Sequence, residues 1–299
     1  MIECQKVYKK YEGNEAVQSV ELEVKQGSIY GLLGSNGAGK TTLLKIIAGI
    51  LKQDKGKVSI QGAPVFENID IKKKIIFMPD TPYFFSQYTL RQMANFYSSI
   101  FPNWNEERFQ KLQDIFEIEM DKKLHKFSKG MKRQAAFWLA FSTMPDVLIL
   151  DEPFDGLDPV MRKKIKNIMI QDVAEREMTV LISSHNLREV EDICDHVGIL
   201  HKGRIILEKD LDDLKSDVHK IQIAFKNEPQ AEWLREMKTL HYERRGSVWL
   251  CVVRGHETEV KSYFEQYEPV IFDMLPLTLE EIFIYEMGEV GYAIQNILV

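Results

Sequence analysis

One stretch of the sequence decides the fold: Gly34-Ser35-Asn36-Gly37-Ala38-Gly39-Lys40-Thr41. It fits the pattern G-x-x-x-x-G-K-[ST] of a phosphate-binding loop, which works only between a strand and a helix. Apolar residues 29–33 predict that strand, and residues 42–49 predict a helix that ends near a glycine. A chance glycine-rich turn would lack the lysine, the threonine and both flanks. The stretch therefore predicts binding of a nucleoside triphosphate.

The loop residues have separate expected roles. Backbone N–H groups and the positive end of the following helix face the anion. Lys40 is expected to reach the terminal phosphates, and the Thr41 hydroxyl to bind Mg²⁺. The glycines let the backbone approach oxygen atoms that a Cβ would block. The predicted nucleotide contacts are Gly34, Ser35, Asn36, Gly37, Ala38, Gly39, Lys40, Thr41 and Thr42.

Composition limits the other possibilities. The 299 residues carry a net charge of −6 and no long basic run, which disfavours nucleic acid as the main partner. Cys4, Cys194 and Cys251 lie far apart without a C-x-x-C pair, a pattern that favours reduced thiols in the cytosol. No apolar stretch reaches the ~18 residues needed to span a bilayer, and no secretion signal is evident at the start.

Strands and helices are expected to alternate as in a largely parallel α/β sheet. The predicted strands are 2–8, 19–24, 29–33, 56–61, 74–78, 147–150 and 179–183, closed by a hairpin at 197–207. The predicted helical segments are 89–143 and 158–175.

A polar run at 215–217 predicts a domain boundary, giving domains 1–214 and 215–299. In the second domain the expected order is β-α-β-β-α-β, a ferredoxin-like α+β arrangement, with its first helix at 229–238. A further helix is expected at 279–287.

Two carboxylates follow the apolar strand 147–150. One acid in this position holds the Mg²⁺ shell and the next orients the attacking water. We assign Asp151 to the metal and Glu152 to the water as general base. An acidic turn after a buried strand is the alternative. The presence of a phosphate loop in the same chain disfavours this alternative.

Two further segments are expected near the same edge of the sheet. His185 follows the strand 179–183 and could donate to a γ-phosphate oxygen, whereas a structural histidine is the alternative. Ser128 and Gly130 open a helix and offer a second anion site, the alternative being an N-cap by Ser128.

With Phe154-Asp155-Gly156-Leu157-Asp158-Pro159, this set resembles the ATP-binding subunit of an ABC transporter over residues 1–210. Residues 127–131 stand at its Leu-Ser-Gly-Gly-Gln signature, Asp151-Glu152 at its Walker B motif, Asp158 in its D-loop and His185 at its switch histidine. Tyr11 stands at its adenine-stacking aromatic. The resemblance implies a P-loop NTPase core with an N-terminal antiparallel β-subdomain and a helical subdomain at about 84–143.

The sequence departs from the family pattern at two sites. Asp80 replaces the usual Q-loop glutamine and is expected in the Mg²⁺ shell. Lys129 and Met131 replace a glycine and the glutamine of the signature. The resulting form is similar to ATPases of ABC-2-type exporters of drugs, antibiotics and other small molecules.

The resemblance implies a head-to-tail dimer, with an identical or a paralogous second subunit. Ser128, Lys129, Gly130 and Met131 would contact the ATP of the partner subunit. Hydrolysis would power a separate transmembrane permease, which places the protein peripherally at the cytoplasmic membrane face. Aromatic residues 83–88 either receive a helix of that permease or fill the subdomain core.

The sequence is also compatible with two other functions. A soluble ABC-type ATPase acting on nucleic acid or ribosomes usually has two modules or a long coiled coil, and neither is evident. A regulatory module that binds ATP without turnover is disfavoured by the presence of Glu152 and His185. The aspartate at position 80, in place of the usual glutamine, is compatible with such a module.

Overall fold

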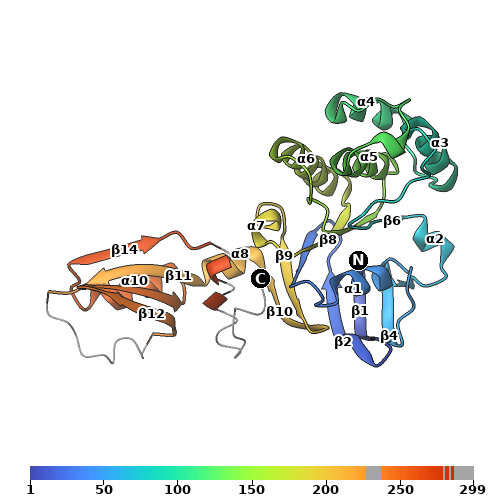
Figure 1. The fold of residues 1–299 in the computed structure, drawn as a ribbon. Helices are drawn as coiled ribbons and strands as arrows, with labels where there is room; N and C mark the ends of the chain where they lie inside the picture. The colour runs from blue at the N-terminus through green and yellow to red at the C-terminus, as the bar shows by residue number, and fades with distance from the viewer. Residues whose placement is uncertain (227–236, 279, 283, 286–299) are drawn as a thin grey trace. The chain divides into compact units, whose positions relative to one another are not determined.

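The computed structural model describes residues 1–226, 237–278, 280–282 and 284–285 (Figure 1). Contacts divide the chain into two compact units, residues 1–208 and 209–299. The domain boundary predicted from the sequence, residue 214, lies inside helix α8 (Leu211–Ser216). Asp210 caps this helix and Leu211 and Leu214 are buried, so the polar run at 215–217 ends a helix.

The first unit begins with an antiparallel sheet. Its strands are β1 (Ile2–Tyr11), β2 (Asn14–Val24), β4 (Lys55–Ile60) and β5 (Ala63–Pro64), in the order β2-β1-β4-β5. Buried residues alternate along β2 at Val20, Leu22 and Val24, as expected for a strand with one face in a core. This is the predicted N-terminal β-subdomain.

A six-stranded sheet forms the centre of the same unit. Its order is β10-β9-β3-β8-β7-β6, and the four pairs from β9 to β6 are parallel. The strands are β3 (Ile29–Leu33), β6 (Ile75–Met78), β7 (Val147–Asp151), β8 (Thr179–Ser184), β9 (His196–His201) and β10 (Arg204–Asp210). Because parallel strands share a direction, β3, β7 and β8 end at one edge, where the predicted site residues follow them.

Helix α1 (Lys40–Ile47) packs against strands of both sheets. Leu43, Leu44, Ile46 and Ile47 of this helix enter the main core, which also contains residues of β1, β2, β3, β4, β7 and β8. The helix that follows the phosphate loop is thus held from two sides.

Other helices surround the central sheet. They are α2 (Ile69–Lys72), α6 (Pro159–Arg176) and α7 (Leu187–Val190), of which α6 and α7 contact β8. The helical subdomain consists of α3 (Leu90–Ile100), α4 (Glu106–Phe116), a short turn at Leu124–Lys126 and α5 (Lys129–Ser142). Figure 1 shows α3, α4 and α5 gathered into one group. Trp138 joins α5 to α4, because its ring stacks on Phe109 at 5.0 Å and on Phe116 at 5.8 Å.

The second unit contains a four-stranded antiparallel sheet in the order β12-β13-β11-β14. Its strands are β11 (Val218–Ala224), β12 (Thr239–Arg245), β13 (Val248–Arg254) and β14 (Ile271–Leu275), and α10 (Glu257–Glu265) packs its Val260 and Phe264 into their core. This is the strand order of a ferredoxin-like fold. The helix predicted at 229–238 falls largely outside the described residues. The helix predicted at 279–287 is partly described, and residues 280–282 and 284–285 are helical.

Within the described part of the chain, every helix is too short or too polar to cross a membrane.

Candidate nucleotide site

The phosphate loop connects β3 to α1, and its glycines have different structural reasons. A Cβ on Gly34 would lie 2.3 Å from the carbonyl oxygen of Leu200, and one on Gly39 would lie 2.2 Å from that of Ala16. Gly37 has open space around it but a φ of +80°, a conformation that favours glycine. Packing against the protein's own backbone therefore accounts for Gly34 and Gly39. Gly37 allows the loop to turn.

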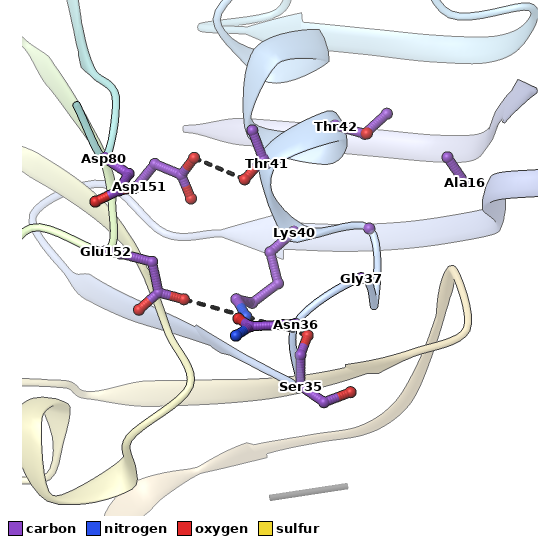
Figure 2. A pocket seen from close by; sticks show the side chains of 11 residues that line it. Ala16, Ser35, Asn36, Gly37, Lys40, Thr41, Thr42, Asp80, Asp151 and Glu152 are labelled. Carbon is purple, nitrogen blue, oxygen red and sulfur yellow. Dashed lines mark hydrogen bonds and ion pairs between the residues drawn. The ribbon is translucent and has the colours of Figure 1, made fainter. Parts of the chain in front are cut away.

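Lys40 is the first residue of α1, and its ammonium group is almost fully buried. The Nζ atom donates to the Gly34 carbonyl at 2.5 Å and lies 3.1 Å from Oε1 of Glu152 (Figure 2). The contact with Glu152 is an ion pair and not a hydrogen bond, since Oε1 of Glu152 has no hydrogen-bond partner. Lys40 thus joins the loop to the residue assigned as base.

Thr41 and Asp151, the two residues assigned to Mg²⁺, are in direct contact. The Thr41 hydroxyl donates to Oδ2 of Asp151 at 2.7 Å (Figure 2). The Ser183 hydroxyl donates to Oδ1 of Asp151 at 2.6 Å. Asp151 ends β7 and lies opposite Ser183 in the register with β8. Its buried carboxylate is therefore held at both oxygens.

Glu152 follows β7 with a φ of 45°, which is unusual for a residue with a side chain. Its N–H donates to the Ser183 hydroxyl at 3.1 Å, and its Oε2 lies 2.8 Å from Nδ1 of His185. Its carboxylate thus lies between Lys40 on one side and His185 on the other, with only 14% of the side chain exposed.

Asp80 follows β6, and its Oδ1 accepts a hydrogen bond from Arg133 at 2.9 Å. Arg133 also donates to the backbone carbonyls of Asp80 and Glu152. The Q-loop position is thus bound to helix α5, which begins at the signature segment.

A pocket of ≈ 310 Å³ opens above the phosphate loop. Three carboxylates and one ammonium group line it, so its charged side chains sum to a negative value. The lining residues are Ala16, Ser35, Asn36, Gly37, Gly39, Lys40, Thr41, Thr42, Asp80, Asp151 and Glu152. Apart from Ala16, every one of them was predicted from the sequence.

The remaining predicted residues lie outside this lining. Ser128 caps α5 by accepting from the Met131 N–H at 3.2 Å, and Asp158 caps α6 by accepting from the N–H groups of Val160 and Met161. Tyr11 ends β1, with the Lys9 ammonium 5.7 Å from its ring centroid. The others outside the lining are Gly34, Ala38, Lys129, Gly130, Met131 and His185.

Sequence reasoning missed Ser183 and Arg133 as members of the site. A serine at the end of an otherwise apolar strand, next to the strand that carries Asp151, was the available signal for Ser183. Arg133 had no comparable signal, because a basic residue on a helix is usually exposed.

The residues present fit a magnesium–nucleotide complex. Mg²⁺ prefers oxygen ligands and is bound by one or two carboxylates together with phosphates. Thr41 and Asp151 supply hydroxyl and carboxylate oxygens at the N-terminus of α1. Among the described residues there is no group of three or more His, Cys, Asp and Glu side chains that could hold a metal without the nucleotide.

The family model described as ABC transporter matches residues 17–155. ABC transporter ATP-binding protein YtrB of Bacillus subtilis is 34% identical over 288 residues, which cover 96% of this chain and 98% of that protein. This chain belongs to the ABC transporter ATP-binding proteins. It is an ATPase subunit of a transporter, and it binds ATP.

Two further comparisons agree with this assignment. Bacitracin transport ATP-binding protein BcrA of Bacillus licheniformis is 36% identical over 210 residues, 69% of each chain. The solved structure titled "Structure of ATP binding subunit of ABC transporter" superposes with a TM-score of 0.67 at 28% identity, covering 72% of this chain and 92% of that one. The P-loop NTPase fold is thus shown together with the family.

Proposed function

We propose that residues 1–208 form the ATPase domain of an exporter and hydrolyse ATP at the seam of a head-to-tail dimer. One observation carries the chemical part: the Glu152 carboxylate contacts both Lys40 and His185 at the rim of the phosphate loop. The dimer, the exported class and the permease go beyond this contact.

Mg²⁺ has a place in this proposal because the pocket is lined by three carboxylates and one lysine. Such a lining repels a free triphosphate, so the nucleotide is expected to enter as its magnesium complex. Thr41 and Asp151 would hold the metal, which supplies charge neutralisation at the phosphates. Asp80 lines the same pocket and was placed in this shell by the sequence.

Each protein group then has a defined task. Lys40 exchanges Glu152 for phosphate oxygens when ATP binds, which leaves the carboxylate able to accept a proton from water. His185, which lies beside Glu152, donates a hydrogen bond to a γ-phosphate oxygen. The N-terminus of α5 in the second subunit, with Ser128, Lys129, Gly130 and Met131, closes over the ATP.

The chemical assignment is tested with Glu152→Gln. This variant is expected to lose phosphate release and to accumulate as an ATP-dependent dimer, measured by size-exclusion chromatography with light scattering. Glu175→Gln, on the exposed face of α6, is the matched control and retains turnover. Normal hydrolysis by the Glu152 variant would show that another group is the base.

The permease is expected to dock on an aromatic patch formed by Tyr83, Phe85, Tyr88 and Phe96. Tyr83 is 85% exposed, and the rings of Phe85 and Phe96 lie 5.3 Å apart at the surface. Phe84, by contrast, is buried. The segment therefore divides: Phe84 belongs to the interior, and its neighbours form an exposed apolar surface of the kind that marks interaction sites.

Serine at both Tyr83 and Phe85 tests this surface. We expect recovery with the membrane fraction to be lost, while ATP turnover and the melting temperature of the isolated protein stay unchanged. Tyr242→Ser, at an exposed tyrosine of the second unit, is the control. Undiminished recovery of the Tyr83/Phe85 variant would remove the patch as the docking site.

The proposed cargo class is a drug, antibiotic or other small molecule, moved outward. Support comes from the signature form Ser-Lys-Gly-Met and from the similarity to a bacitracin transport protein. Purification of the native complex from membranes, followed by identification of its other subunits, tests the cargo, the peripheral location and the identity of the second ATPase subunit together. A complex that lacks a membrane subunit would contradict the proposal.

A further inference from the structure

Arg133 is fully buried, and it is not among the residues that line the nucleotide pocket. It lies in the second turn of α5, on the helix that Ser128 caps. Its guanidinium reaches away from the helix to two separate loops, one after β6 and one after β7. The side chain therefore connects three segments that each carry a predicted site residue.

A buried guanidinium needs both an anion and hydrogen-bond acceptors, because burial removes its hydration. Asp80 supplies the anion, with Oδ1 2.9 Å from a terminal nitrogen of Arg133. The acceptors are the carbonyl oxygens of Asp80 and Glu152. The two terminal nitrogens form a rigid planar fork. A single side chain thus fixes the spacing between the backbone of Asp80 and that of Glu152.

We propose that Arg133 is a positioning residue for hydrolysis, which sets the backbone at Glu152, and that Asp80 serves as its counter-ion. The proposal rests on the assigned role of Glu152 as base. It gives the aspartate at the Q-loop position a function that a neutral glutamine could not perform, namely compensation of a buried positive charge. Arg133 lies on α5, which begins at the signature segment, so its hydrogen bond to Glu152 links the signature segment to the base.

This role differs from that of a metal ligand in what a substitution changes. If Asp80 acts through Arg133, Asp80→Asn impairs the geometry of Glu152 and lowers kcat at every Mg²⁺ concentration. If Asp80 acts on the metal, the same change raises the Mg²⁺ concentration needed for half-maximal activity and leaves kcat at saturation intact. A magnesium titration of the purified chain separates the two.

The test compares Arg133→Gln, Arg133→Lys, Asp80→Asn and the double variant of Arg133→Gln with Asp80→Asn. We expect each single change to lower kcat by roughly ten-fold or more, as misplacement of a reacting group does. The KM for ATP should stay within about two-fold, because the phosphate loop is untouched. The double variant should be no slower than the slower single variant, since both remove one connection. Hydrogen exchange at the backbone of 79–82 and 151–153 should become faster in Arg133→Gln.

Arg91 and Asp121 provide the matched control. They form an Arg–Asp pair with the same 2.9 Å separation but with both side chains exposed, so Arg91→Gln and Asp121→Asn should leave kcat and exchange unchanged. Arg133→Lys keeps a positive charge at the buried position, and Asp80→Asn changes a side chain that is half exposed. They carry the test if Arg133→Gln does not fold, as judged by its melting curve.

The proposal is overturned by normal kcat in folded Arg133 variants, by additive losses in the double variant, or by a shift confined to the Mg²⁺ requirement. Glu152→Gln is measured in parallel. Its normal turnover would refute the base assignment, whereas an inactive Glu152 variant beside fully active Arg133 variants would refute only the positioning role.

Discussion

Lys40 is expected to stabilise the nucleotide-free protein as well as to bind phosphate. Its ammonium lies 3.1 Å from Glu152, and the two side chains are only 6% and 14% exposed. Lys40→Met removes the charge and keeps most of the aliphatic stem, so that packing changes little. The variant leaves the Glu152 carboxylate with His185 but without its nearest cation.

The size of the effect follows from the distance and the burial. At an effective dielectric constant of about 20, two unit charges this close attract by about 5 kcal/mol. The desolvation of the lysine offsets more than half of that gain. We therefore expect a loss of about 2 kcal/mol in the free energy of unfolding, which in a unit of this size lowers the melting temperature by about 4–8 °C.

The assay is thermal unfolding of four nucleotide-free proteins: the unchanged chain, Lys40→Met, Glu152→Gln and the double variant. The loss caused by Lys40→Met should shrink strongly in the Glu152→Gln background, because the charge that it strands is gone. Lys10→Met breaks the exposed ion pair with Glu15 and should leave the melting temperature unchanged. An equal loss in both backgrounds, or none in either, would refute the interaction.

Two other predictions concern groups away from the charges. Gly39→Ala should abolish ATP binding and destabilise the protein strongly, because its Cβ would lie 2.2 Å from a backbone oxygen. Gly37→Ala should cost only the ~1–2 kcal/mol of a strained φ. Isothermal titration with ATP and thermal melts compare the two variants, and equal losses of binding and stability would contradict this reasoning. The chain has three buried cysteines: Cys4, Cys194 and Cys251. Burial raises the pKa of Cys4 and of Cys251 to about 12 and also raises the pKa of Cys194. At pH 8 the folded protein should therefore resist iodoacetamide, and urea should expose all three thiols, as mass spectrometry of the alkylated protein will show. Rapid alkylation of the folded protein would rule out this burial.

Much of the site could be predicted because its parts are local in sequence. The phosphate loop lies between β3 and α1, and Asp151 and Glu152 directly follow the buried strand β7. Such motifs carry their own strand and helix signals, so the chain shows them before it folds. The succession of four strands along the second unit could be read in the same way, from its apolar runs.

The parts that escaped prediction depend on contacts between distant segments. Arg133 meets Asp80 across 53 residues, and Ser183 meets Asp151 across 32. Neither pair leaves a periodic pattern. The packing reason for Gly39, a close approach to Ala16, was equally hidden. Which aromatic side chains of residues 83–88 are buried and which are exposed also could not be predicted without the fold, since an aromatic side chain fits an interior and an interface equally well.

Gly130 of the signature segment packs closely against the loop before α6. A methyl group at 130 would come within 2.8 Å of the carbonyl oxygen of Gly156, so the protein's own backbone leaves position 130 no room for a side chain. Sequence drift is therefore expected to spare this glycine even in a descendant that has lost its ATPase activity. Its presence alone is a poor guide to whether a related gene still encodes a working motor.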